Sequence, residues 1–281
     1  MDTLTQQARA EALRALHHEP FPLILPNAWD VVSARLFEEA GCRAIGTTSA
    51  GIAATLGYPD GERVPRAEML AVVGRIAHAV TIPVTADIEA GYGDTPAEAA
   101  RTAQAVIAAG AVGLNLEDGT GDRGRPLADN AAQMAKIHAI REVAVAAAMP
   151  LVLNARTDVY WLAAGDAEGC FAAAVERLRA YWAAGADCLF VPGVVDGETI
   201  GQLVRAVEGP LNVLAGAGTP AIADLGRLGV KRVSVGSAPL RATLGLVRRI
   251  ADEVLRKGTY TAMTTDALPY AEVNQLLAAR A

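Results

Sequence analysis

Acidic side chains stand at several points of this sequence where an apolar run has just ended. Asp87 and Glu89 close one such run, Glu117 closes another, and Asp60 lies in the turn-like stretch GYPDG. If these ends meet in space, the carboxylates repel one another and their pKa values rise unless a cation is present. Oxygen ligands without histidine or cysteine select a hard ion, Mg²⁺ or Mn²⁺. The pattern therefore predicts a metal site. The alternative is that these acids cap helices or pair with arginines.

Two further stretches are suited to binding a small organic acid beside such a metal. Arg156 ends the run MPLVLNAR, and its planar guanidinium can hold a carboxylate through two hydrogen bonds. The stretch TTSAG, residues 47–51, offers hydroxyls and backbone N–H groups to an anion. Together they describe a pocket for a small α-keto acid with its keto oxygen on the metal. A metal there stabilises the enolate formed when a C–C, C–P or C–H bond breaks. The alternative for Arg156 is a purely structural salt bridge.

A repeating unit of helix and strand must position these residues. The phrases EEAGCRAIGTT, IAAGAVGLNLED, YWAAGADCLFVP and GRLGVKRVSVGS each read as a helix end, a glycine suited to the left-handed position, and a buried strand. Strands are predicted near 22–25, 44–48, 82–87, 112–117, 150–155, 187–191, 210–215 and 232–236. Eight such units predict a (β/α)8 barrel, which keeps its chemistry at the carboxyl ends of its strands. The alternative, a doubly wound open sheet, usually shows a GxGxxG turn that is missing after the first strand.

Composition narrows the class of protein further. The chain has 281 residues, 52% of them hydrophobic, and a net charge of −6, which disfavours nucleic acid as a partner. No apolar run is long enough for a membrane span, and the polar start of the chain does not resemble a signal peptide. Three unevenly spaced cysteines form no disulfide or zinc pattern. We therefore expect one cytoplasmic domain over residues 1–281, with an N-terminal helix at about 1–18.

Four motifs in order make the chain resemble the isocitrate lyase/phosphoenolpyruvate (PEP) mutase superfamily. They are TTSAGIAATLGYPDG, ADIEAGYGD, LNLED and NARTD, and the resemblance extends from LPNAWDVVSARLFEEAG to APLRATL. It implies a modified (β/α)8 barrel whose last barrel helix is swapped between subunits of a homotetramer, a dimer of dimers. Residues from about 240 to 281 would then form C-terminal helices that pack on a partner subunit.

The resemblance also implies roles for individual residues. Asp87 matches the direct Mg²⁺ ligand, and Glu89 and Glu117 match the acids that hold metal-bound water, with Asp60 assisting. Arg156 matches the substrate arginine. The substrate carboxylate would lie on Thr48, Ser49 and Ala50, and Asp87 would face the substrate through the metal. The predicted catalytic residues are Asp60, Glu117, Arg156 and Tyr58. Of these, Tyr58 is expected to be a proton donor near the mouth of the barrel.

One segment departs from the family. Lyases carry a Lys-Lys/Arg-Cys-Gly-His lid, and mutases and phosphonopyruvate hydrolases carry Lys-Thr-Asn-Ser, but here the sequence is EDGTGDRGRPLAD. If residues 119–129 close as a lid, Arg123 and Arg125 would supply charge. We predict a Mg²⁺-dependent C–C lyase or decarboxylase for a small 2-oxo or 2-hydroxy acid. The alternatives are a C–P phosphonomutase or phosphonopyruvate hydrolase, a phosphate-binding barrel isomerase, and a keto-acid binder without catalysis.

Overall fold

A computed structural model describes residues 2–162 and 166–278, in which parallel strands alternate with helices. The predicted N-terminal helix at about 1–18 includes Met1, and the predicted C-terminal helices at about 240–281 include residues 279–281. These four residues lie outside the described range. The strands are β1 (Leu23–Leu25), β2 (Asn27–Ala28), β3 (Ile45–Thr47), β4 (Val84–Asp87), β5 (Gly113–Glu117), β6 (Val152–Arg156), β7 (Cys188–Phe190), β8 (Leu211–Leu214) and β9 (Arg232–Ser234).

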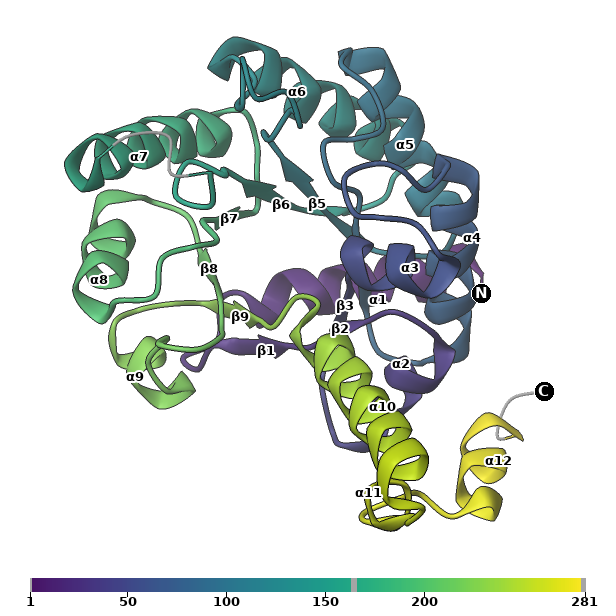
Figure 1. The fold of residues 1–281 in the computed structure, drawn as a ribbon. Helices are drawn as coiled ribbons and strands as arrows, with labels where there is room; N and C mark the ends of the chain where they lie inside the picture. The colour runs from purple at the N-terminus through teal and green to yellow at the C-terminus, as the bar shows by residue number, and fades with distance from the viewer. Residues whose placement is uncertain (1, 163–165, 279–281) are drawn as a thin grey trace.

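The described strands close into a barrel. Their order is β1-β9-β8-β7-β6-β5-β4-β3-β2, and every neighbouring pair is parallel. The two ends of this order, β1 and β2, are consecutive in the chain and separated only by Pro26. Because proline has no N–H group to donate, the first barrel strand is split there into two pieces. β1 matches the predicted run 22–25, and β2 is a continuation that was not predicted. The predicted (β/α)8 barrel is confirmed in a modified form (Figure 1).

The described helices alternate with the strands, and most of them lie on the outside of the barrel (Figure 1). They are α1 (Thr3–Leu16), α2 (Val31–Glu39), α3 (Ser49–Leu56), α4 (Arg66–Ala79), α5 (Pro96–Ala108), α6 (Asn130–Ala146), α7 (Ala167–Ala183), α8 (Gly197–Ala206), α9 (Ile222–Arg227), α10 (Ala238–Lys257), α11 (Thr261–Thr264) and α12 (Tyr270–Ala278). The core consists of aliphatic side chains between these helices and the strands. Among the described helices, none combines the length and apolar composition that crossing a bilayer requires.

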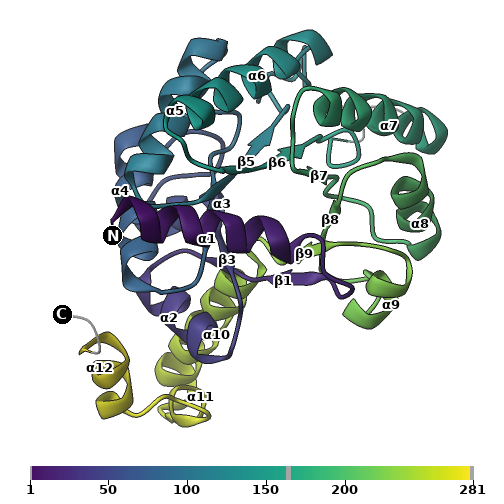
Figure 2. The ribbon, with the colours of Figure 1, turned by 180° about the vertical axis from the view of Figure 1, so that it is seen from behind.

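Helix α1 covers the amino-terminal end of the barrel (Figure 2). The Asp2 side chain caps it by accepting the Thr5 N–H at 2.8 Å. Leu13 lies so close to Gly113, at the start of β5, that a Cβ there would be 3.0 Å from its side chain. His17 follows α1 and is buried, with Nδ1 2.7 Å from the Leu13 carbonyl oxygen. This end of the barrel is therefore closed, which leaves the carboxyl ends of the strands for a site.

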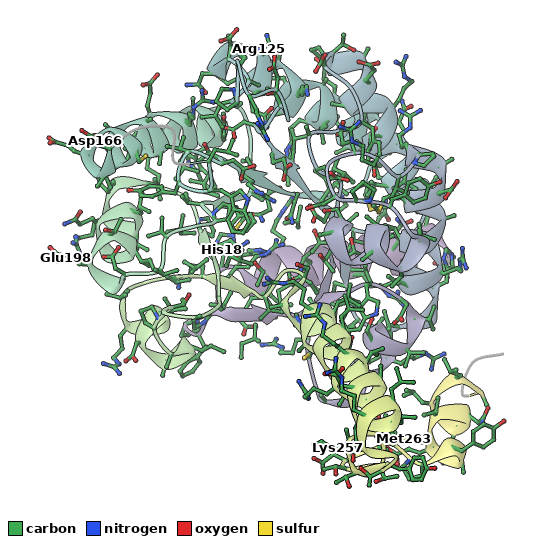
Figure 3. The ribbon with its side chains drawn as sticks, viewed as in Figure 1. His18, Arg125, Asp166, Glu198, Lys257 and Met263 are labelled. Atoms are coloured by element: carbon green, nitrogen blue, oxygen red, sulfur yellow. The ribbon has the colours of Figure 1, made fainter. Side chains whose placement is uncertain are left out.

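Helix α10 projects from the barrel instead of packing along it (Figures 1 and 3). Lys257 ends α10 and Met263 lies in α11, and Figure 3 places both at the far end of the projection. Leu240 is the buried residue of α10, whereas Val247 is 61% exposed and Leu255 is 84% exposed. Packing of this segment on a partner subunit, and a single domain over the whole chain, remain predictions.

Candidate active site

Three neighbouring strands end in charged residues at the same edge of the barrel. β4 ends in Asp87, β5 in Glu117 and β6 in Arg156. The strand register pairs Glu117 directly with Arg156. The parallel arrangement therefore brings together side chains from distant parts of the sequence, as the sequence pattern predicted.

Arg156 is the positive centre of this cluster. Its Nη1 lies 2.7 Å from Glu117 Oε2, and its Nε and Nη2 lie 2.6 and 3.1 Å from the two carboxylate oxygens of Asp158. The guanidinium also lies over the Phe190 ring, 5.7 Å from its centroid. Burial alone would lower the pKa of Arg156, but the carboxylates of Glu117 and Asp158 outweigh it and raise this pKa. Arg156 is therefore charged, and two carboxylates hold it in place.

The surrounding acids carry more negative charge than this one arginine compensates. Burial, reinforced by the Asp87 carboxylate, raises the pKa of Glu89 to about 7 and also raises the pKa of Asp60. Burial likewise raises the pKa of Glu117 well above its ordinary value, although Arg156 opposes this shift. The local arrangement therefore favours either bound protons or an additional cation.

The stretch that was predicted to bind an anion lies at the start of α3. Thr48 is the N-cap of this helix, and its Oγ1 accepts the Gly51 N–H at 3.3 Å. Ser49 donates to Asp87 Oδ2 from its backbone N–H at 3.1 Å and from its hydroxyl at 2.8 Å. Ala50 is the second residue of α3. The predicted carboxylate cradle is thus in direct contact with the predicted metal ligand Asp87.

Two loops beside the site are fastened together by Glu62, which the sequence analysis did not single out. Its backbone N–H donates to Glu89 Oε2 at 2.5 Å, and its Oε1 accepts the Tyr92 N–H at 2.7 Å. Glu62, Glu89 and Tyr92 all have positive φ angles of 53–59°, a conformation that costs energy for residues other than glycine. Strain concentrated in one pair of loops is typical of a functional site. The one sequence feature that could have indicated a role for Glu62 is its position two residues after the predicted site residue Asp60.

A cavity of about 240 Å³ lies over these groups. The predicted residues Ser49, Asp60, Glu89, Glu117 and Arg156 line it. It is also lined by Gly61, Glu62, Ala90, Gly119, Thr120, Gly121, Asp158, Trp161 and Leu162. Tyr58 does not line this cavity and packs against the core.

Asp118 follows Glu117 but has a structural role. It is buried, and its carboxylate accepts the Tyr181 hydroxyl at 2.7 Å, Arg177 Nη1 at 3.0 Å and the Asp158 N–H at 2.8 Å. Asp118 therefore positions the backbone of Asp158, which in turn holds Arg156.

The segment where the family carries its lid forms a short hairpin. Gly119 and Leu127 make an antiparallel bridge, and the Thr120 N–H donates to the Pro126 carbonyl at 3.0 Å. Gly119 and Thr120 line the cavity, while Arg125 lies at the edge of the molecule (Figure 3). Closure of residues 119–129, with charge from Arg123 and Arg125, remains a prediction.

The carboxylates of the site fit a hard cation in chemistry, although they are not arranged as ready-made ligands. Among the described residues, no three acidic, histidine or cysteine side chains form a group that could hold a metal ion. Instead, Asp87 accepts from Ser49 and Glu117 pairs with Arg156. The donors are all oxygens, and burial together with neighbouring carboxylates raises the pKa values of Glu89 and Glu117, so a cation would favour their charged forms. Ser49 contacts Asp87 at Oδ2 and Arg156 contacts Glu117 at Oε2, so a cation bound to these two oxygens would compete with both residues.

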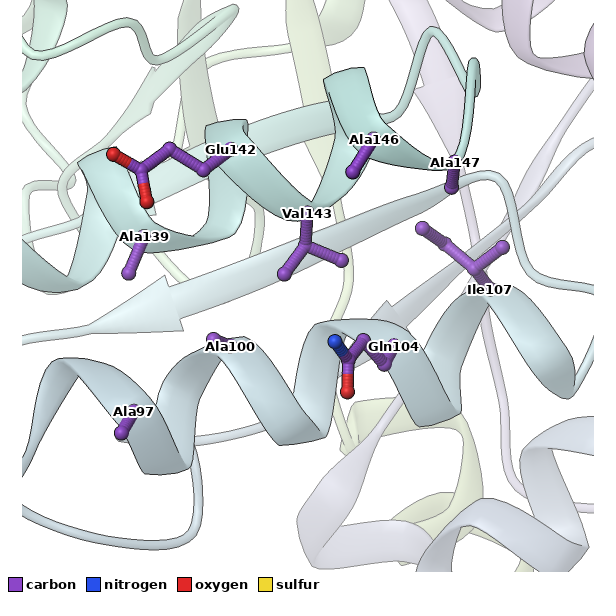
Figure 4. Close-up of a pocket in the computed structure, with 9 residues that line it drawn as sticks. All are labelled: Ala97, Ala100, Gln104, Ile107, Ala139, Glu142, Val143, Ala146 and Ala147. Carbon is purple, nitrogen blue, oxygen red and sulfur yellow. The ribbon is translucent and has the colours of Figure 1, made fainter.

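Two other places in the fold are weaker candidates. A hollow of about 700 Å³ between α5 and α6 is lined mainly by alanines and aliphatic side chains, with Glu142 as the one charged lining residue (Figure 4). At the end of β9, the N–H groups of Val235 and Gly236 donate to Asn27 Oδ1 at 3.0 and 2.9 Å. Because Asn27 occupies these donors, they are not free to bind the phosphate of the isomerase alternative.

Comparisons with known proteins cover almost the whole barrel. Residues 13–255 match the family described as phosphoenolpyruvate phosphomutase. A solved structure from Burkholderia cenocepacia J2315, described only as a lyase/mutase, is 41% identical and covers 99% of this chain and 98% of its own, with a TM-score of 0.92. Oxaloacetate decarboxylase from Bradyrhizobium sp. strain BTAi1 is 31% identical, covering 98% of this chain and 97% of its own. The structure of 2,3-dimethylmalate lyase is 26% identical and covers 95% and 94%, with a TM-score of 0.82.

Proposed function

Because the chain belongs to the phosphoenolpyruvate phosphomutase family, within the isocitrate lyase/PEP mutase superfamily, we propose that it is a divalent-metal-dependent C–C lyase or decarboxylase for a small 2-oxo or 2-hydroxy acid. The observation that carries this proposal is the cluster of Asp87, Glu89 and Glu117 near a single arginine, Arg156, in which Glu89 is buried and the other three residues are half-buried. Such a cluster suits a cation and an anionic substrate together. The named activities of the decarboxylase and of the dimethylmalate lyase support the same class of reaction.

The metal of this proposal is Mg²⁺ or Mn²⁺, held by Asp87, Glu89 and Glu117. A bound cation would supply positive charge to the oxo or hydroxyl oxygen of the substrate and stabilise the negative charge that develops there. Asp60 lines the same cavity and has a raised pKa, so it is suited to assist as a proton carrier. Tyr58, the proton donor expected from the sequence, packs against the core, so its role has less support.

The substrate carboxylate would bind between Arg156 and the start of α3. Arg156 Nη1 contacts Glu117 at 2.7 Å, and the Ser49 N–H donates to Asp87 at 3.1 Å. If Glu117 and Asp87 bind a cation, these donors become available to an anion, together with the Thr48 hydroxyl and the backbone N–H of Ala50. The Thr48 N–H is not among them, because it donates to the Ala28 carbonyl at 3.0 Å. Metal and substrate would then occupy the site cooperatively.

The cavity lining favours C–C over C–P chemistry in this proposal. The hairpin contributes Gly119, Thr120 and Gly121, without the thiol or the lysine and asparagine of the family lids. Decarboxylation needs charge stabilisation at the substrate oxygen and protonation of a carbon, and it needs no nucleophile from the protein. Activity on phosphonopyruvate is therefore the comparison that distinguishes C–P from C–C chemistry.

The direct experiment supplies oxaloacetate, 2-methylisocitrate and phosphonopyruvate with Mg²⁺ and measures pyruvate, phosphate and phosphoenolpyruvate. We expect pyruvate from a carboxylic acid, and a loss of at least a hundredfold in kcat/KM in Glu117→Gln. Asp94→Asn, an exposed acid on a neighbouring loop, is the matched control and should keep full activity. Phosphate release would support the hydrolase form of the C–P alternative, and conversion of phosphonopyruvate to phosphoenolpyruvate would support the mutase form. The absence of any product, with or without cation, would overturn the proposal.

We propose further that α10 mediates assembly into a homotetramer. Leu244, Val247 and Leu255 expose apolar surface along a helix that projects from its own barrel. Such surface is typical of a protein interface.

A further inference from the structure

The candidate cavity has an apolar region that the proposed chemistry does not use. Trp161 and Leu162 line it, and they are 56% and 43% exposed. Large apolar side chains that stay exposed at the edge of a small cavity are typical of a ligand-binding surface. The rest of the lining is formed by acids, small residues and Arg156.

The backbone around Trp161 is held in place from two sides. The Leu162 N–H donates to the Asp158 carbonyl at 2.9 Å, and Asp158 is itself bound to Arg156. On the other side, Gly193 has a φ of +92°, and a Cβ there would be 3.0 Å from the Trp161 backbone nitrogen. Only glycine permits this approach without strain. Trp161 and Leu162 form the rim of the cavity. The backbone of this rim is thus held both by Asp158, which binds Arg156, and by the loop after β7.

The charges of the cavity disfavour an acidic group at this rim. The lining holds the carboxylates of Asp60, Glu62, Glu89, Glu117 and Asp158, with Arg156 as the one described cation. Arg156 is already shared between Glu117 and Asp158. A second carboxylate placed against Trp161 would therefore find no free positive partner among the described lining residues, whereas an alkyl group would cover exposed apolar surface.

We propose that this site takes 2-oxo or 2-hydroxy acids that carry an alkyl substituent, and that Trp161 and Leu162 bind this substituent and determine specificity. The inference rests on the proposed function and adds the substrate class to it. The cavity volume of about 240 Å³ limits the ligand to a small acid with a short chain.

The experiment measures binding by calorimetry in the presence of Mg²⁺, with pyruvate, 2-oxobutanoate and 2-oxopentanoate as ligands. Each added methylene should tighten binding about fourfold if it is buried against the rim. The matched dicarboxylate 2-oxopentanedioate should bind at least tenfold more weakly than 2-oxopentanoate. Oxalate is included because it reports on the metal and carboxylate half of the site alone.

Variants assign the effect to the rim. Trp161→Ala should remove most of the dependence on chain length while leaving oxalate binding unchanged, and Trp161→Phe should retain much of it. Phe21→Ala removes another aromatic side chain, 81% exposed and outside this cavity, and should change nothing.

The outcomes separate this inference from the proposed function. If oxalate binds but chain length has no effect, or if Trp161→Ala keeps the wild-type dependence, the inference is wrong and the proposed function stands. If the dicarboxylate binds more tightly than 2-oxopentanoate, the inference is also wrong. If neither oxalate nor any 2-oxo acid binds with Mg²⁺, both are overturned.

Discussion

Replacing Glu62 with alanine should loosen the two loops beside the candidate site while the barrel remains folded. Glu62 Oε1 accepts the Tyr92 N–H at 2.7 Å, and this bond joins the loop that carries Asp60 to the loop that carries Glu89. A hydrogen bond to a charged group contributes about 1.5–3 kcal/mol, and we take about 2 kcal/mol because Glu62 is partly exposed. That loss raises the population of the open loop about 30-fold.

Hydrogen exchange measures this opening without knowledge of the substrate. In Glu62→Ala the Tyr92 amide should exchange about 30-fold faster than in the wild type, because exchange follows the open population. Glu62→Gln keeps an acceptor oxygen and should change the rate only a few-fold, and Glu68→Ala, an exposed acid in the first turn of α4, is the control. An unchanged Tyr92 amide in Glu62→Ala would refute the reasoning.

Two further predictions concern stability and assembly. Burial, assisted by the charge of Arg232, lowers the pKa of His17 to about 3 from 6.5. Between these two values the unfolded chain binds a proton that the folded protein does not, so the free energy of unfolding falls as the pH falls. From pH 7 to pH 5.5 this loss is about 1.3 kcal/mol. The raised pKa of Glu89 changes stability in the opposite direction over this range, but equally in the wild type and in His17→Asn. Urea unfolding should therefore show the free energy of unfolding of the wild type falling by about 1.3 kcal/mol relative to that of His17→Asn. The same change in both proteins would contradict the assignment. Light scattering should report a tetramer for the wild type and a smaller species for Val247→Glu in α10, whereas Val145→Glu, on the exposed side of α6, should stay tetrameric. A wild-type monomer would rule out the assembly.

Most of the strand framework could be predicted from the sequence. Buried parallel strands are short apolar runs, and the glycine after each helix marks where a strand is about to begin. The predicted run 112–117 therefore lies within one residue of β5 at both ends. The predicted run 150–155 begins two residues before β6 and ends one residue before it does. The predicted run 22–25 matches β1, but β2 was missed because Pro26 interrupts the apolar run, and the pattern of apolar residues does not show how a barrel closes.

The site could be predicted in part, because strand ends meet at one edge by topology. That rule placed Asp87, Glu117 and Arg156 together. It could not distinguish Asp118 from Glu117, since their different roles depend on contacts with Tyr181 and Arg177 from another helix. Nor could it identify Glu62 or Trp161. Their positions depend on loop conformations and on close approaches between loops that leave no periodic signal in the sequence.

The most direct test of the central claim is a calorimetric titration of the wild type and of Asp87→Asn with Mg²⁺ and Mn²⁺. The claim is that Asp87, Glu89 and Glu117 hold one hard cation that supports a bound oxo acid. It predicts one cation per chain in the wild type, tighter binding in the presence of oxalate, and loss of this binding in Asp87→Asn. A wild-type protein that takes up neither ion, or an Asp87→Asn variant that binds as tightly as the wild type, would contradict it.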